Sequence, residues 1–139
     1  MKIKINMMKL EDISHPKLKN YINLVYMQGE NNNQDAISKL EEDIKEYIDD
    51  KYFILSVDKN DLVKIPYGND GEFLCPIFTD EKEYTLGMQY FSLNGMEELN
   101  EFKIEKLNEY NKILKNNPKF LGYIINISSV SYIINTNLI

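Results

Sequence analysis

The only cysteine of the chain, Cys75, lies in the apolar run FLCPIF and is the first residue to weigh as a nucleophile. A reactive thiolate needs a cation, a helix N-terminus or a histidine close by, because each of these lowers the thiol pKa. The nearest charged residues in the sequence, Glu72 and Asp80, are acidic and raise that pKa instead. The only histidine, His15, is far away in the sequence. We therefore interpret Cys75 as a small, buried, structural residue.

Three carboxylates, Asp80, Glu81 and Glu83, follow this run and could perform acid–base chemistry or bind a divalent metal ion. The same residues are typical of the first turn of a helix, where the helix dipole stabilises negative charge. Thr79 or Asp80 would then accept a hydrogen bond as the N-cap residue. We favour the capping interpretation and keep a metal-dependent hydrolase that uses Asp80, Glu81 and Glu83 as an alternative.

The composition excludes several classes of site and partner. The chain has 139 residues, with 22 acidic and 16 basic ones, and a net charge of -6; every basic residue is lysine. An acidic protein without arginine lacks the usual ligand of phosphate and guanine, so we expect no nucleic-acid partner. One cysteine and one histidine rule out thiolate-rich and multi-histidine metal sites. No phosphate-binding or dinucleotide-binding motif is present, and we expect no cofactor.

The apolar segments are too short for a membrane protein. No run approaches the roughly 20 apolar residues that cross a bilayer. Residues 1–14 lack the continuous apolar core of a signal peptide. We therefore expect a cytoplasmic protein with no membrane partner.

Acidic residues are concentrated between Glu30 and Asp50. Two interpretations of this segment are open. It can be the solvated side of a helix, as most charge runs are, or a docking face for a basic protein partner. In the second case the binding residues are Glu41, Glu42, Asp43 and Glu46.

Two helices are predicted in the first third of the chain. The first begins near Pro16, which suits the first turn of a helix, and its apolar stripe contains Leu18, Tyr21, Ile22 and Val25. The second follows an asparagine run that can cap it, and its apolar stripe contains Ile37, Leu40, Ile44, Tyr47 and Ile48. We expect the two helices to pair as a hairpin, and residues 1–10 to form a short strand.

The rest of the chain is predicted to form a sheet with further helices. Residues 52–78 favour a three-stranded antiparallel meander, in which Pro76 must lie at a sheet edge, at a bulge or opposite no neighbouring strand. Residues 79–87 favour a short helix ending at Gly87, and residues 88–93 a strand. Asn94 and Glu97 resemble a capping box, which predicts a long helix up to Leu114. Residues 120–127 favour a strand and residues 130–138 a last short helix.

Together these elements predict one α+β domain over residues 1–139. We expect a mostly antiparallel or mixed sheet of about 4–6 strands, packed with about 3–5 helices.

Two segments resemble motifs of the bacterial SseB N-terminal domain family, the enhanced-serine-sensitivity proteins. FLCPIFTDEKEY (Phe73–Tyr84) is similar to that family's strand, P-x-F-T-[DS] motif and acidic helix. GYIINISSVSYII (Gly122–Ile134) is similar to its G-x-x-[IVL]-N-P strand and turn, although Ile127 stands where the family usually has proline. The resemblance covers residues 38–139, and residues 1–37 form a less typical N-terminal extension.

This resemblance implies a compact α+β domain that serves as an accessory or interaction module, with no catalytic residue to transfer. It also implies structural roles for five residues. Phe78 is expected in the core, Thr79 and Asp80 at a helix cap, Gly122 at a close packing contact, and Asn126 in a bond to its own turn.

The expected function is therefore non-enzymatic protein binding, by a monomer or a homodimer. An acidic immunity protein or antitoxin that neutralises a cationic toxin is the first alternative, because the chain is small and its second predicted helix is acidic. The metal-dependent hydrolase is the second alternative.

Overall fold

The computed structural model describes residues 8–96, 99–136 and 139. Within them the chain forms one α+β domain with four α-helices, a short 3-10 helix and a seven-stranded mixed sheet. The predicted fold class is confirmed. The strand number is higher than predicted because two strands have only two residues each.

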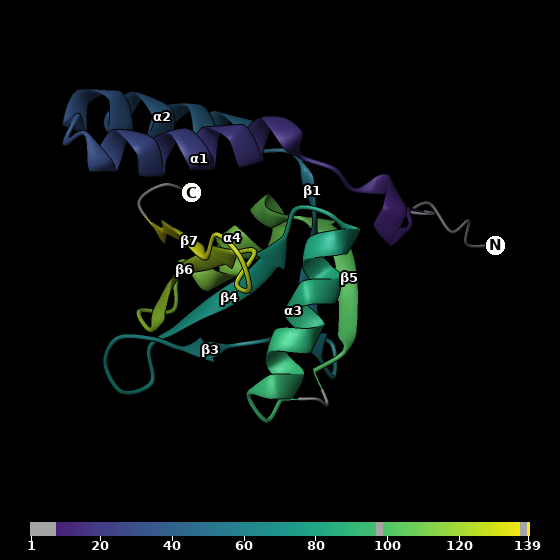
Figure 1. Ribbon diagram of the computed structural model, residues 1–139. Helices are drawn as coiled ribbons and strands as arrows, with labels where there is room; N and C mark the ends of the chain where they lie inside the picture. Colours follow the sequence, from purple (N-terminus) through teal and green to yellow (C-terminus); the bar gives the residue numbers. More distant parts are fainter. Residues whose placement is uncertain (1–7, 97–98, 137–138) are drawn as a thin grey trace.

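Figure 1 shows the order of these elements along the chain. The helices are η1 (Leu10–Asp12), α1 (Pro16–Glu30), α2 (Gln34–Ile48), α3 (Glu81–Leu93) and α4 (Leu107–Leu114). The strands are β1 (Tyr52–Asp58), β2 (Asp61–Leu62), β3 (Ile65–Pro66), β4 (Phe73–Phe78), β5 (Glu101–Lys106), β6 (Phe120–Ile125) and β7 (Tyr132–Asn135).

Strand β4 lies at the centre of the sheet, between antiparallel β1 and parallel β6. On the outer sides, β5 pairs with β1 and β7 pairs with β6, both antiparallel. The short strands β2 and β3 pair with β1 and β4 where these two strands diverge. Among the described residues β4 and β6 form the only parallel pair, so their carboxyl ends meet at one edge of the sheet.

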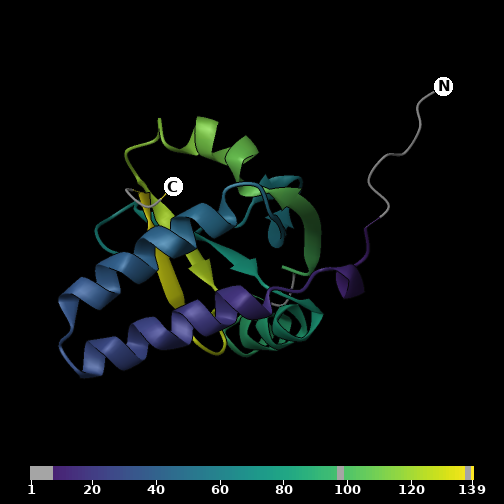
Figure 2. The same ribbon diagram turned by 90° about the horizontal axis from the view of Figure 1, so that it is seen from above.

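Helices α1, α2 and α4 cover one face of the sheet, and α3 covers the other (Figures 1 and 2). Alternate residues of β1 point to opposite faces of the sheet. Phe53 packs under the three helices, and Ile54 packs under α3. Both side chains are fully buried. Burial on two faces explains why β1 and β4 read as continuous apolar runs in the sequence.

The helical hairpin is confirmed. Helix α1 begins with Pro16, and α2 begins after Asn33, whose side-chain oxygen accepts the Ala36 N–H at 3.2 Å. The predicted stripe residues Leu18, Ile22, Ile44 and Ile48 are buried against the sheet. The two helices lie side by side above it (Figure 2).

The predicted three-stranded meander is wrong, because its first and third strands pair directly, with Ile54 opposite Phe78. Pro76 lies inside this central strand, at a position where no neighbour is available on one side. The Ile77 carbonyl accepts a bond from the Asn126 N–H on the β6 side, so the Pro76 nitrogen points the other way. On that side of β4, the pairing with β3 ends at Leu74 and the pairing with β1 begins only at Ile77. The missing N–H of Pro76 therefore costs no ladder bond, as the third predicted alternative required.

The predicted helix end at Gly87 and the strand at residues 88–93 are also wrong. Helix α3 continues through Gly87 to Leu93. A methyl group on Gly87 would lie 2.3 Å from a ring carbon of Phe78. The glycine is therefore needed for close packing of the helix on the sheet, and it does not end the helix.

The long helix predicted from Asn94 to Leu114 is replaced by a strand and a shorter helix. Asn94 is the C-cap of α3 and not the N-cap of a new helix, and Glu97 lies outside the described residues. Strand β5 pairs with β1 along its whole length, and α4 follows directly from Leu107.

The last predicted helix is a strand, β7. Asn126 and Ser131 adopt φ values of 54° and 49°, which turn the chain back so that β7 runs antiparallel to β6. The strand predicted in residues 1–10 lies mostly outside the described residues, and Leu10–Asp12 is a turn of 3-10 helix. None of the described helices is both long and apolar enough to cross a membrane.

Candidate functional site

The carboxyl ends of β4 and β6 bring together the two segments on which the family resemblance rests. Thr79 is the first residue after β4, and Asn126 is the first residue after β6. Because the two strands are parallel neighbours, with Ile77 opposite Ile125, these residues meet at the same edge of the sheet. Ligand sites of open α/β sheets often lie at such an edge.

Asn126 and Thr79 are joined by two buried hydrogen bonds. The Asn126 side-chain oxygen accepts the Thr79 backbone N–H at 3.1 Å, and its side-chain nitrogen donates to the Thr79 hydroxyl at 3.0 Å. The Asn126 carbonyl accepts the N–H groups of Ser129 and Ser131. The expected bond to its own turn is therefore made by the Asn126 backbone, while its side chain holds the β4–α3 connection.

Asp80 is the N-cap residue of α3, as predicted. Its carboxylate accepts the Glu83 N–H at 3.0 Å, the Thr79 hydroxyl at 2.9 Å and the Lys19 ammonium at 3.3 Å. Burial by itself raises the pKa of Asp80, but these three donors outweigh burial and lower it. Asp80 is thus a carboxylate held in its ionised form.

Glu83 is a buried carboxylate with partners on two other elements. It is 6% exposed, accepts the Ser129 hydroxyl at 2.8 Å, and lies 3.8 Å from the Lys19 ammonium. Glu81, in contrast, is exposed. Lys19 is therefore shared by two of the three carboxylates, and no group of three metal-binding side chains occurs in the part of the chain that the structure describes.

Sequence reasoning missed Lys19 and Ser129 as members of this cluster. Lys19 comes from α1 and Ser129 from the β6–β7 turn, and neither carries a local pattern that points to α3. Together with Asp80 and Glu83 they fasten three elements to one another. The arrangement supplies strong polar contacts, and each carboxylate already has its donors.

The two other residues of the resemblance have the packing roles that it implies. The Phe78 side chain is fully buried, and its ring meets the Tyr84 ring edge-on at 5.5 Å. Gly122 has a φ of 140°, and a methyl group there would lie 2.0 Å from the Ile134 carbonyl oxygen. Only glycine allows β6 and β7 to approach so closely.

Cys75 is a buried core residue, as predicted, with 1% of its surface exposed. Burial raises the pKa of its thiol to about 12, although Lys64 has a smaller opposing effect. The thiol therefore stays protonated and unreactive at neutral pH.

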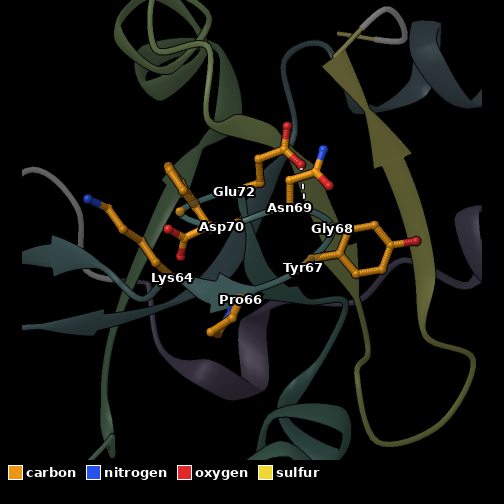
Figure 3. A pocket seen from close by; sticks show the side chains of 9 residues that line it. Lys64, Pro66, Tyr67, Gly68, Asn69, Asp70 and Glu72 are labelled. Carbon is orange, nitrogen blue, oxygen red and sulfur yellow. Dashed lines mark hydrogen bonds between the residues drawn. The ribbon is translucent and has the colours of Figure 1, made fainter.

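A surface hollow of about 540 Å³ lies at the β3–β4 turn, lined by residues 66–73 and Lys64 (Figure 3). Lys64 and Tyr67 extend to opposite sides of it. The Glu72 carboxylate accepts the Asn69 N–H at 2.6 Å across the turn, and Lys119 donates to the Asp70 carbonyl. The polar groups of this hollow thus stabilise the turn itself.

The acidic residues predicted as a docking face lie on α2 but point in different directions. Asp43 pairs with Lys39 at 2.9 Å. Glu41 is half-buried, and burial of Tyr132 together with the Glu41 charge raises the pKa of Tyr132 to about 12. Glu42 and Glu46 are exposed, one turn apart.

Glu42 in the middle of α2, Glu46 in its last turn and Asp49 at its C-cap form an acidic surface. With Lys45 these three residues line a hollow of about 420 Å³. Within the described residues no ion pair involves Glu42, Glu46 or Asp49. We call these three residues the α2 acidic surface.

No protein-family model matches the chain, and neither a curated protein nor a solved structure is significantly similar to it. The resemblance to the SseB N-terminal domain family therefore stays a prediction.

Proposed function

We propose that this chain is a protein-binding module that docks a basic partner on the α2 acidic surface. The observation that carries the proposal is that Glu46 lies in the last turn of α2 and Asp49 at its C-cap, with Glu42 one turn before Glu46. The helix dipole is negative at this end, so the carboxylates of Glu46 and Asp49 are locally unfavourable. Glu42 and Glu46 also repel each other at a spacing of four residues.

A sequence that breaks local rules without a compensating contact often does so at a functional site. A cationic group bound in the hollow between these carboxylates would relieve both the dipole and the mutual repulsion. The exposed Lys45 is the one basic residue in the last turn of α2. Three carboxylates against one ammonium leave this surface with a net negative charge for a basic partner to neutralise.

The proposal agrees with the interaction role that the SseB resemblance implies, and it keeps the cytoplasmic location expected from the sequence. A cationic toxin is one partner with the required chemistry, and the chain would then be an immunity protein or antitoxin. The α2 acidic surface therefore also supports the immunity protein or antitoxin as a second candidate function.

The test is affinity capture from the native host with matched charge-reversal variants. The first variant carries Glu42→Lys, Glu46→Lys and Asp49→Lys. The control carries Asp58→Lys, Asp61→Lys and Glu109→Lys, which are exposed residues outside the α2 acidic surface with the same total change of charge.

We expect a basic protein that the unchanged chain and the control retain and the first variant loses. With that protein purified, the first variant should bind at least about tenfold more weakly, and added salt should slow association with the unchanged chain. Equal binding by both variants would refute the α2 acidic surface as the docking site.

A further inference from the structure

His15 is buried where the helical hairpin joins the sheet. It is the residue before α1, its side chain makes no cap bond, and 6% of its surface is exposed. Its ring stacks on Phe53 of β1 at 4.5 Å and meets Tyr47 of α2 edge-on at 5.6 Å. One imidazole thus contacts both the hairpin and the strand beneath it.

A neutral imidazole can make both hydrogen bonds of His15. Nε2 lies 2.6 Å from the Tyr52 carbonyl oxygen, which can only accept, so Nε2 carries the proton. Nδ1 lies 2.7 Å from the Tyr47 hydroxyl, and in the neutral ring it accepts a hydrogen bond from that hydroxyl. Every polar group of the contact is satisfied while the imidazole is uncharged.

A second proton on Nδ1 disturbs this arrangement in two ways. The Tyr47 hydroxyl can no longer donate to Nδ1 and must turn round, and a positive charge is placed in a site with little access to water. Lys51 lies close on one side and disfavours that charge, while Asp80 favours it. Asp80 is already paired with Lys19, which reduces the help it gives.

We propose that His15 is a pH-sensitive contact, at which proton uptake weakens the attachment of the α1–α2 hairpin to strand β1. A charged imidazole gains hydration when it leaves the space between Phe53 and Tyr47, and the first turn of α1 then loosens from the sheet. The inference rests on the packing of His15 and is independent of the proposed docking role.

The direction of the pH dependence follows from the pKa of His15. Burial, the largest cause, lowers this pKa below the ordinary value of 6.5; the Tyr52 carbonyl raises it, Lys51 lowers it further and Asp80 raises it. The opened chain therefore binds the proton more readily than the closed one. The attachment is fully present above pH 6.5 and is lost as the pH falls from 6.5 through the lower native pKa.

The test is NMR of the full chain between pH 7.5 and pH 5. Because His15 is the only histidine, one imidazole resonance reports its titration without assignment conflicts. Hydrogen exchange at the Lys19 N–H, which bonds to the His15 carbonyl at 3.1 Å, reports local opening. We expect a His15 midpoint below 6.5 and loss of Lys19 protection over that pH range, by about tenfold for each unit of pKa separation. The amides of β6 and β7 serve as the internal reference.

Two variants make the test decisive. His15→Gln can keep both hydrogen bonds but cannot titrate, so its Lys19 protection should not change with pH beyond that of the reference amides. Lys51→Gln removes a repelling charge, so the His15 midpoint and the loss of Lys19 protection should both move to higher pH. The proposal is overturned by a His15 midpoint at or above 6.5. It is equally overturned if Lys19 protection does not follow the His15 midpoint in the unchanged chain and in Lys51→Gln.

Discussion

Asn126 bonds to Thr79 through both atoms of its side-chain amide group, at 3.1 and 3.0 Å, and the two residues are almost completely buried. They are distant in the sequence and adjacent only because β4 and β6 are parallel neighbours. The bond pair ties the start of α3 to the β6–β7 turn. It therefore supports the packing of an entire edge of the sheet.

Replacing Asn126 by alanine should lower the free energy of unfolding by about 3 kcal/mol. The Thr79 N–H would lose its buried acceptor, at a cost of about 1–3 kcal/mol, and alanine at a φ of 54° adds about 1 kcal/mol of backbone strain. Urea unfolding measures the loss. Asn126→Gly removes the same hydrogen bonds without the backbone strain, so its stability should lie between that of the unchanged protein and that of Asn126→Ala. A loss below about 1 kcal/mol in Asn126→Ala would contradict this role of Asn126.

Gly122→Ala should destabilise the fold by about 3 kcal/mol or more, because the added methyl group meets the Ile134 carbonyl oxygen of β7. The matched control is Gly29→Ala in α1, where a methyl group finds no atom within 4 Å. That change should instead stabilise the protein by about 0.5 kcal/mol, since alanine favours the helix. Thermal unfolding of the two variants compares them directly. Similar melting temperatures would show that the β6–β7 contact tolerates a side chain.

Cys75 should resist thiol reagents in the folded protein. With its pKa raised to about 12, only about one molecule in 10,000 carries a thiolate at pH 8, against about a quarter of unfolded chains. Labelling by an aromatic disulfide, followed by absorbance, should be at least about 1,000-fold slower in buffer than in concentrated urea. Rapid stoichiometric labelling of the folded chain would show that the thiol is accessible and reactive.

A metal ion that binds the folded protein raises its melting temperature, because a ligand stabilises the state that binds it. We expect no such binding, so millimolar Mg²⁺, Mn²⁺ or Zn²⁺ should leave the melting temperature within about 1 °C of its value without metal. Asp80 and Glu83 already share the Lys19 ammonium, and Asp80 also caps α3. Lys19→Gln is the informative comparison, since it removes the cation that the two carboxylates share. A clear upward shift in the unchanged protein would instead favour the metal-dependent hydrolase.

Local patterns were sufficient to predict the elements whose reason is local. The α1 and α2 stripes lie within single helices, and the Asn33 and Asp80 caps need only the next three residues. The burial of Cys75 followed from the length of its apolar run. These features would be the same for many arrangements of the sheet.

The elements that the sequence analysis missed depend on distant partners. Gly87 lies inside α3 because the Phe78 ring beneath the helix leaves no room for a side chain at that position. Nothing near Gly87 in the sequence reveals this contact. Strand β5 (Glu101–Lys106) alternates in polarity, but its strand form is stabilised by pairing with β1. The apolar residues around it fitted a helical spacing equally well.

The site was predictable in its residues and not in its connections. Phe78, Thr79, Asp80, Gly122 and Asn126 were all named from two short segments. Their meeting point requires β4 and β6 to be parallel neighbours, and no local pattern in either segment indicates that pairing. Lys19 enters only because the beginning of α1 reaches the beginning of α3 across the edge of the sheet.

Asp80 should make the stability of the fold sensitive to acid. Its native pKa lies below the ordinary value of 3.8, so its contribution is fully present above pH 3.8 and is lost as the pH falls through the native pKa. Asp80→Ala should cost about 1–2 kcal/mol at pH 7, the usual effect of losing an N-cap. The gap between the two proteins should narrow at pH 3, because below pH 3.8 the unfolded chain binds a proton at Asp80 more readily than the native chain does. Urea unfolding at both pH values measures the gap.

Asp80→Asn can still accept the Glu83 N–H and should lose less stability than Asp80→Ala at pH 7. A gap of the same size at pH 7 and pH 3 would mean that the charge of Asp80, and hence its contact with Lys19, does not stabilise the start of α3.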